Sequence, residues 1–187
     1  MVERNKRRLY VAFFRRKPTR NVPVKFHTAL IVARKSGLWP SSDSDIVKKL
    51  YLYEAINRID PSTSQDTWFY EVTPLAEIPE RVQKLSGLMF VGKLPASLSD
   101  EELRNMLDND VPRKKFVADD LSWRCHTWIW DALTLLVSRQ LIPALPKSPE
   151  QSWRDAIQFM DDKDPPSSLS RIPCCDESGK ALANGWI

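Results

Sequence analysis

The sequence predicts an α+β domain, with an antiparallel five-stranded sheet and helices packed on one face. Five segments rich in β-branched and aromatic residues come first, and three segments with helical periodicity follow them. This order is typical of an antiparallel sheet covered by later helices, because parallel strands would need a connecting helix between each pair. The 187 residues are 42% apolar and include 7 Trp and 7 Phe, which is enough for one core.

The strands are expected at residues 8–14, 24–33, 48–57, 68–73 and 85–93. The second strand carries apolar residues on both faces, which is typical of an interior strand. In the third strand Glu54 alternates with Leu50, Leu52 and Ile56, so a carboxylate interrupts an apolar face.

Each of the three helices begins at a residue type that commonly caps a helix. They are expected to run from Ser97 or Ser99 to about Leu107, from Ser122 to about Gln140, and from Ser148 to about Met160. Residues 1–161 are therefore predicted to form a single domain. Residues 162–187 contain several Pro and Ser and are expected to be a C-terminal tail, extended and partly ordered at best.

The net charge of +4 is unevenly distributed along the chain. Residues 1–20 hold eight Lys or Arg and one Glu, whereas the rest of the chain has a small acidic excess. The basic end contains no zinc, helix-turn-helix or RNP-type motif, so nucleic acid is not the expected partner. We interpret this end as a solvated strand edge whose charges prevent edge-to-edge aggregation.

The chain is expected to be cytoplasmic. No apolar run approaches the ~18 residues that a membrane span needs, and no signal-peptide pattern precedes the first strand.

Three cysteines are present, and two of them, Cys174 and Cys175, are adjacent, a spacing that strains a disulfide. We therefore expect free thiols in a reducing compartment, with Cys174 and Cys175 titrating near the ordinary value of ~8.5.

Cys125 is the first candidate for chemistry. It comes three residues after the expected cap Ser122, which places it in the first turn of the longest helix, on the face expected to meet the sheet. Unpaired backbone N–H groups and the helix dipole favour a thiolate there, and the same amides can bind the oxyanion of an acyl intermediate. The alternative is an inert core cysteine, since free cysteines are among the most buried residues.

His27 and Glu54 are the residues expected to act with Cys125. His27 lies in the middle of a predicted sheet strand, where an imidazole facing the helix could accept the thiol proton. Glu54 on the neighbouring strand could accept a hydrogen bond from that imidazole and orient it, and Asn57 is the alternative orienter. The competing interpretations are a core histidine bound to a backbone carbonyl and a carboxylate that reaches solvent.

Four residues are assigned to substrate binding: His126, Trp128, Trp123 and Asn57. His126 follows Cys125 but is turned about 100° around the helix, so it is not the expected base. Trp123 and Trp128 are proposed to line an apolar acyl site, although tryptophans at this spacing are also common in cores. No phosphate-loop, dinucleotide or metal-ligand spacing is present, so neither a cofactor nor a metal is expected.

Short motifs along residues 8–140 carry a resemblance to known proteins. The order of a histidine strand, a polar strand and a helix-borne cysteine resembles the circularly permuted papain-like (LRAT-like, NlpC-type) fold. More closely, the segments LYVAFFRRKP, FHTALIV, YEAIN, WFYE, VGKL and RCHTWIWDAL resemble an uncharacterised family of small fungal proteins. Its pattern places His27 on the strand histidine and Cys125 on the helix cysteine. The chain departs from that pattern at Glu54, where histidine is usual, and at Arg124, where asparagine is expected.

This resemblance implies a thiol-dependent hydrolase or acyltransferase that acts on an amide or ester through a thioester intermediate. In it His27 takes the proton of Cys125, which attacks a carbonyl of a small-molecule, acyl or peptide substrate. The alternative hypothesis is a catalytically silent binding protein that uses its basic edge and aromatic surface to hold a partner or small molecule. Thiol reactivity distinguishes the two, because a binding module has no need of a thiolate at neutral pH.

Overall fold

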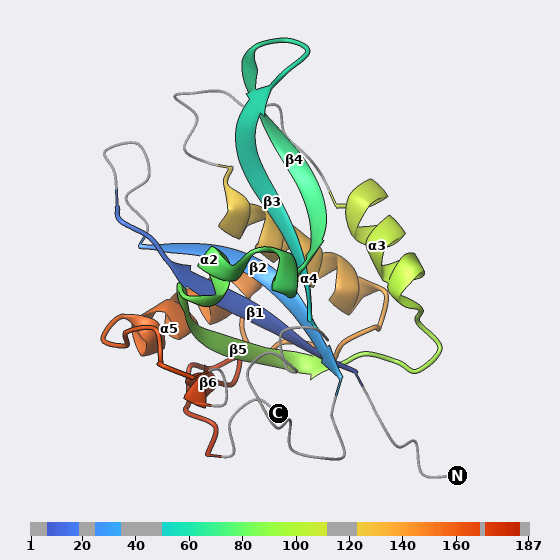
Figure 1. Cartoon of the computed structure of the whole chain (residues 1–187). Helices are drawn as coiled ribbons and strands as arrows, with labels where there is room; N and C mark the ends of the chain where they lie inside the picture. The colour runs from blue at the N-terminus through green and yellow to red at the C-terminus, as the bar shows by residue number, and fades with distance from the viewer. Residues whose placement is uncertain (1–6, 19–24, 35–49, 112–122, 169–170, 184–187) are drawn as a thin grey trace.

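A computed structural model describes residues 7–18, 25–34, 50–111, 123–168 and 171–183. It contains one six-stranded sheet with the strand order β4-β3-β2-β1-β5-β6 (Figure 1). The strands are β1 (Arg7–Arg15), β2 (Phe26–Arg34), β3 (Tyr51–Asp60), β4 (Gln65–Pro74), β5 (Leu85–Lys93) and β6 (Cys174–Cys175). All neighbouring strands pair antiparallel except β5 and β6, which are parallel.

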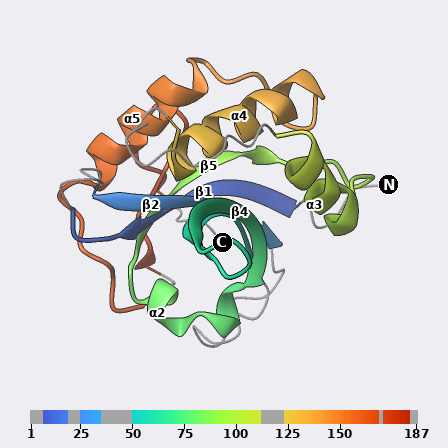
Figure 2. The same ribbon diagram turned by 90° about the horizontal axis from the view of Figure 1, so that it is seen from above.

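The three longer helices, α3 (Asp100–Asn109), α4 (Cys125–Ser138) and α5 (Pro149–Met160), pack on one face of the sheet (Figure 2). The opposite face is covered in part by the short helices η1 (Leu75–Glu77) and α2 (Pro79–Val82). The predicted α+β class and the antiparallel pairing of the five long strands are therefore confirmed. Within the described residues no helix is both long and apolar enough to cross a bilayer.

Strand β1 lies in the middle of the sheet, between β2 and β5. Its alternate residues Leu9, Val11 and Phe13 face the helices, while Tyr10 and its neighbours of the same parity pack on the other face. Both sets are buried, which explains why the sequence LYVAFF has no polar face. The expectation of a solvated strand edge is therefore wrong: both edges of β1 are paired, and its arginines gather at the ends of the strand.

The sheet has one strand more than predicted, and this strand comes from the expected tail. Cys174 and Cys175 pair with Leu88 and Met89 of β5 and are both buried. Leu88 N–H also donates to Pro173 C=O at 2.9 Å, which holds the segment against β5. A two-residue strand has too little periodicity to be recognised in a sequence, because its stability comes from the edge it covers.

The starts of α3 and α5 agree with the sequence prediction, because a capping serine side chain fixes each of them. Ser99 caps α3 in a capping box with Glu102, and Ser148 accepts a hydrogen bond from Gln151 N–H at the start of α5. The start of α4 differs from the prediction: its cap is Arg124, and Cys125 is its first residue. Ser122, the expected cap, lies outside the described residues.

Candidate active site

The candidate site lies where β2 and β3 separate. These strands pair only from Leu30–Tyr53 to Val32–Tyr51, and beyond Tyr53 β3 pairs along its other edge with β4. Helix α4 packs against both strands, and its first residue meets the start of β2. There the Thr28 hydroxyl donates to Cys125 Sγ at 3.9 Å, and both side chains are buried. The end of strand pairing therefore makes room for the N-terminus of α4.

His27 and Glu54 meet through their side chains, as the sequence predicts. His27 Nε2 and Glu54 Oε2 are in hydrogen-bond contact, and the two side chains are 13% and 4% exposed. Arg81 Nη1 lies 3.2 Å from the same Glu54 oxygen. The carboxylate therefore does not reach solvent. It is a buried charge with two basic partners, which is the arrangement that a buried carboxylate needs.

The thiol of Cys125 and the imidazole of His27 favour each other's charged forms. Burial raises the pKa of the Cys125 thiol, but the charge of His27, hydrogen bonds from His126 and His27, and the charge of Arg16 together hold it well below its ordinary value. Burial lowers the pKa of His27, but the charges of Cys125 and Glu54 and hydrogen bonds to both raise it above its ordinary value. The pair therefore favours a thiolate and an imidazolium.

The two nitrogens of the His27 ring have different partners. Glu54 occupies Nε2, so Nδ1 is the nitrogen left to exchange a proton with the thiol. A carboxylate on the far nitrogen holds the ring in one orientation and stabilises the imidazolium when it forms. Cys125, His27 and Glu54 thus form a chain of thiol, imidazole and carboxylate.

The first turn of α4 supplies backbone donors next to the thiol. Its first intrahelical bond runs from Trp128 N–H to Arg124 C=O at 3.0 Å, while Arg124 N–H donates to Thr127 Oγ1 at 3.2 Å. The N–H groups of Cys125 and His126 precede that first bond and have no partner within the helix. They lie where the helix dipole is positive, so they are suited to stabilise an oxyanion formed at the thiol.

Three arginines surround this chain of residues. Arg81 contacts Glu54, Arg124 directly precedes Cys125, and Arg16 lowers the thiol pKa by its charge. The pKa of Arg16 itself is lowered by burial and by the charges of Arg124 and Arg81, while Cys125 opposes this effect. Three guanidinium groups against one carboxylate give the surroundings of the thiol an excess of positive charge.

His126 lies beside the thiol and reaches a second helix as well. Its ring stacks on Trp153 of α5 with a centroid distance of 4.9 Å, and the Trp130 ring lies 5.0 Å away. A hydrogen bond from His126 contributes to the low pKa of Cys125. The position of His126, about 100° around the helix from Cys125, predicts a ring that points away from the thiol. The ring instead interacts with the Cys125 thiol and stacks on Trp153 of α5.

The other three residues assigned to substrate binding lie elsewhere. Trp128 is fully buried in the core and packs on Tyr70, and Trp123 is buried with its ring 5.1 Å from that of Trp68. Asn57 is exposed on β3, opposite Trp68 of β4, beyond the residues that pair with β2. Core packing therefore accounts for the two tryptophans, and Asn57 does not take part in the contacts around His27.

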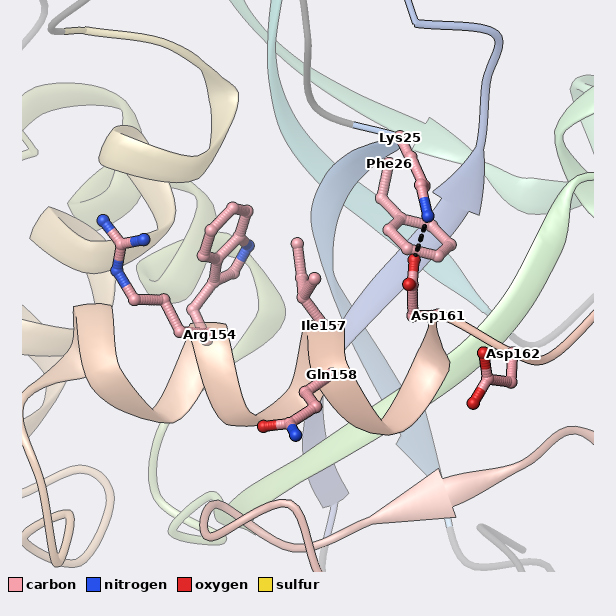
Figure 3. A pocket seen from close by; sticks show the side chains of 8 residues that line it. Lys25, Phe26, Arg154, Ile157, Gln158, Asp161 and Asp162 are labelled. Carbon is pink, nitrogen blue, oxygen red and sulfur yellow. Dashed lines mark hydrogen bonds and ion pairs between the residues drawn. The ribbon is translucent and has the colours of Figure 1, made fainter.

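An aromatic hollow of about 540 Å³ opens between α5 and the start of β2 (Figure 3). Phe26, Trp153 and Ile157 line it with apolar surface, and Lys25 Nζ lies 2.5 Å from Asp161 Oδ1 at one side. Trp153 also stacks on His126, the residue that follows Cys125, so one wall of this hollow contacts a neighbour of the thiol.

Sequence reasoning missed Thr28, Arg16 and Arg81. Thr28 adjoins His27 in the strand, and its buried hydroxyl could have been considered because a polar residue in an interior strand needs a partner. Arg81 lies in a four-residue helix that has no periodicity to detect, and it reaches Glu54 only in the folded chain. Arg16 belonged to a basic run that we interpreted as solvated.

Cys174 and Cys175 differ from the sequence prediction. Like Cys125 they are free thiols, as expected, but both are buried, and burial raises the pKa of each to about 12. They do not titrate near the ordinary value. Within the described residues no group of three or more His, Cys, Asp or Glu side chains is arranged to hold a metal ion.

A family model described as "Family of unknown function (DUF6914)" matches residues 6–165. The match includes Cys125, His27 and Glu54 and the whole of β1–β5 and α3–α5. Comparisons with curated proteins and with solved structures gave no significant match.

Proposed function

Because the chain belongs to this family of unknown function (DUF6914), its activity has to be inferred from the site, and we propose a thiol-dependent hydrolase or acyltransferase. Cys125 is the nucleophile, His27 the base and Glu54 the orienting acid. The substrate is an ester, thioester or amide, and the reaction passes through a thioester. A catalytically silent binding protein is the alternative hypothesis.

One observation carries this proposal: the buried His27 imidazole contacts the Glu54 carboxylate, and its charge and hydrogen bonding lower the pKa of the Cys125 thiol at the N-terminus of a helix. A buried cysteine without a catalytic role gains nothing from a buried imidazole, a carboxylate and helix-end amides around it. Desolvation of so many polar groups costs free energy, which is a common feature of sites shaped by function.

The proposed reaction begins when the Cys125 thiolate attacks the substrate carbonyl carbon and a C–S bond forms. The N–H groups of Cys125 and His126 stabilise the oxyanion of the tetrahedral intermediate. The bond to the leaving group then breaks, and the His27 imidazolium protonates that group, which leaves a thioester on Cys125. Neutral His27 next takes a proton from water or another acceptor, which attacks the thioester and restores the thiolate. Glu54 holds the ring throughout, and Arg81 holds Glu54.

We assign the acyl group of the substrate to the aromatic hollow rather than to Trp123 and Trp128. Its apolar walls, Phe26, Trp153 and Ile157, adjoin the residues beside the nucleophile. Ligand sites are typically concave with apolar walls and some polar groups. Here the polar groups are those of Lys25, Arg154, Gln158, Asp161 and Asp162.

We further propose that the fold is a permuted relative of the papain-like enzymes and that the protein works in the cytoplasm. The support is the chain order: the base comes from β2, the orienting acid from β3, and the nucleophile from the later helix α4. Three free thiols are compatible with a reducing compartment.

The test is the pH dependence of alkylation of the native protein by iodoacetamide, with peptide mapping to identify the thiol. We expect Cys125 to alkylate at pH values well below ~8.5, where an ordinary thiol is protonated. Treatment with p-nitrophenyl acetate should then leave an acetyl group on Cys125 and release p-nitrophenolate in repeated turnovers. The Cys174→Ala variant is the matched control, and it should keep both reactions.

Two results would contradict the proposal. One is a Cys125 that alkylates only near or above pH ~8.5. The other is equal release of p-nitrophenolate by the wild type and by the Cys125→Ser variant, because the ester would then be hydrolysed elsewhere. An unreactive Cys125 would favour the binding-protein alternative.

A further inference from the structure

A second hollow, of about 670 Å³, lies at one end of the interior strands β1, β2 and β5, near the candidate site. We call it the basic hollow, because its described lining consists of two prolines and five cationic side chains, whose aliphatic stems form most of its surface: Arg15, Arg16, Lys17, Lys25 and Lys84. No carboxylate lines it within the described part of the chain.

Three strand ends build the basic hollow. Arg15 ends β1 and Arg16 and Lys17 follow it, Lys25 directly precedes β2, and Lys84 directly precedes β5. Arg15 N–H donates to Lys84 C=O at 2.7 Å, and Arg16 N–H donates to Lys25 C=O at 2.8 Å. These backbone hydrogen bonds hold the five residues together, so their charges gather because of the sheet topology.

Some of this charge is neutralised from one side. Lys25 Nζ lies 2.5 Å from Asp161 Oδ1, and Arg15 donates to the backbone carbonyls of Asp161 and Lys163, with Asp164 Oδ1 4.0 Å from its Nε. Lys17 and Lys84 are exposed, and neither is paired with a carboxylate in the part of the chain that the structure describes. Excess positive charge therefore remains on the side of Lys17 and Lys84.

Arg16 connects the basic hollow to the nucleophile. It is half-buried, it lines the hollow, and its charge acts on Cys125 as well as on Arg81 and Arg124. A concave, rigidly built cluster of like charges attracts anions, and a cleft with low-dielectric walls strengthens this attraction. An anion held here would lie near Arg16, the lining residue whose charge acts on Cys125.

We propose that the basic hollow is the subsite for a negatively charged group of the substrate. The enzyme would then act on small acyl compounds that carry a phosphate or carboxylate group, held by Lys17, Lys84 and Arg16 while Cys125 attacks the carbonyl. This inference rests on the proposed function, because it deepens the description of the same site. Lysine and arginine donate charge-assisted hydrogen bonds to both kinds of oxyanion.

The experiment compares two alkylating agents of nearly equal size on the full chain. Iodoacetate carries a carboxylate and iodoacetamide is neutral, and glutathione gives the reference ratio of their rates. At Cys125 we expect iodoacetate to be favoured by about 10-fold over that ratio, within the range known for electrostatic attraction. The Lys17→Glu/Lys84→Glu double variant should lose this preference. Lys93→Glu/Lys180→Glu makes the same charge change at two exposed residues outside the hollow and should keep it.

Two competitors identify the class of anion. At an ionic strength held constant with NaCl, pyrophosphate or citrate should slow the reaction of iodoacetate in the wild type and in the control variant. Slowing by pyrophosphate alone indicates a phosphate-bearing substrate, and slowing by citrate alone indicates a carboxylate-bearing one.

The outcomes separate this inference from the proposed function. A Cys125 that reacts with neither reagent would overturn the proposed function and this inference with it. If Cys125 reacts with iodoacetate and iodoacetamide at the same rate ratio as glutathione does, only the anionic subsite is overturned. A preference that survives in the Lys17→Glu/Lys84→Glu variant would also overturn it, since the charge responsible would lie outside the basic hollow.

Discussion

Cys125 and the Cys174–Cys175 pair lie in different parts of the molecule and face different neighbours. Cys125 is beside β2 and β3, whereas Cys174 and Cys175 form β6, beyond β5 at the opposite edge of the sheet. All three are buried free thiols. The pKa of Cys125 is nevertheless well below the ordinary value, while those of Cys174 and Cys175 are raised to about 12.

The charges around each thiol explain this difference. Burial disfavours the thiolate at all three positions and is the first cause that acts on each. At Cys125 two histidines and an arginine outweigh it, whereas at Cys174 and Cys175 the carboxylate of Asp176 adds to it. Burial by itself therefore makes a cysteine inert, and a buried cysteine becomes reactive when cations and hydrogen-bond donors surround it.

Unfolding should remove the difference in pKa between Cys125 and the Cys174–Cys175 pair, and it has the largest expected effect. At pH 7 the native Cys174 and Cys175 should be almost unreactive, and in urea their thiolate fraction should rise on the order of 10³-fold as the pKa falls from about 12 to ~8.5. Cys125 should lose its low pKa in the same step. Alkylation with and without urea, followed by peptide mapping, measures all three thiols at once. Native Cys174 labelling as fast as in urea would show that β6 does not protect it.

His27→Ala should make Cys125 resemble the other two cysteines. Without the imidazolium, burial again dominates the thiol, and its alkylation at pH 6 should fall by roughly 10²-fold or more. The rate is measured with iodoacetamide in a protein whose folding is checked by circular dichroism. His27→Gln provides a second variant that retains a polar side chain. Unchanged reactivity in both variants would mean that another group activates the thiol.

Glu54→Gln should reduce reactivity less, by about 10-fold, and mainly at neutral and acidic pH. Glu54 contributes to the raised pKa of His27, so without it the imidazolium that stabilises the Cys125 thiolate forms less readily, and the onset of alkylation should move to higher pH. The pH profile of alkylation measures this shift. Glu71 lies opposite Glu54 on β4 and pairs with Arg58, so Glu71→Gln is the matched control and should keep the wild-type profile. Equal profiles for both variants would show that Glu54 has no orienting role.

Ser99→Ala should have the smallest effect, and it should change the labelling of Cys174 and Cys175 but not that of Cys125. Loss of the capping box of α3 should lower the free energy of unfolding by about 1 kcal/mol. Cys174 and Cys175 react through unfolded molecules, so their labelling should increase about fivefold. Cys125 reacts in the native state and should not change. Labelling time courses at pH 7 make the test, and a parallel increase at Cys125 would mean that its reactivity also requires unfolding.

Much of the fold was predictable because each long strand and helix has its own local signal. Segments rich in β-branched and aromatic residues located β1 to β5, and Ser99 and Ser148 marked the starts of α3 and α5. The candidate chain of Cys125, His27 and Glu54 was also predictable, since a histidine and a carboxylate that interrupt apolar strands need partners. The central position of β1 was missed, because the interpretation followed the basic residues at its ends rather than LYVAFF, whose lack of a polar face is typical of a central strand.

The sequence by itself determined which residues are buried in each long element and that an imidazole and a carboxylate lie within apolar strands. Only the tertiary structure decided which charges surround each thiol. Cys125 gains the charge of Arg16 and Glu54 gains Arg81 from distant segments, and Cys175 gains the edge of β5. The physical reason is that periodicity depends on neighbours along the chain, whereas a pKa depends on the charges and the burial that the folded chain brings within a few ångströms.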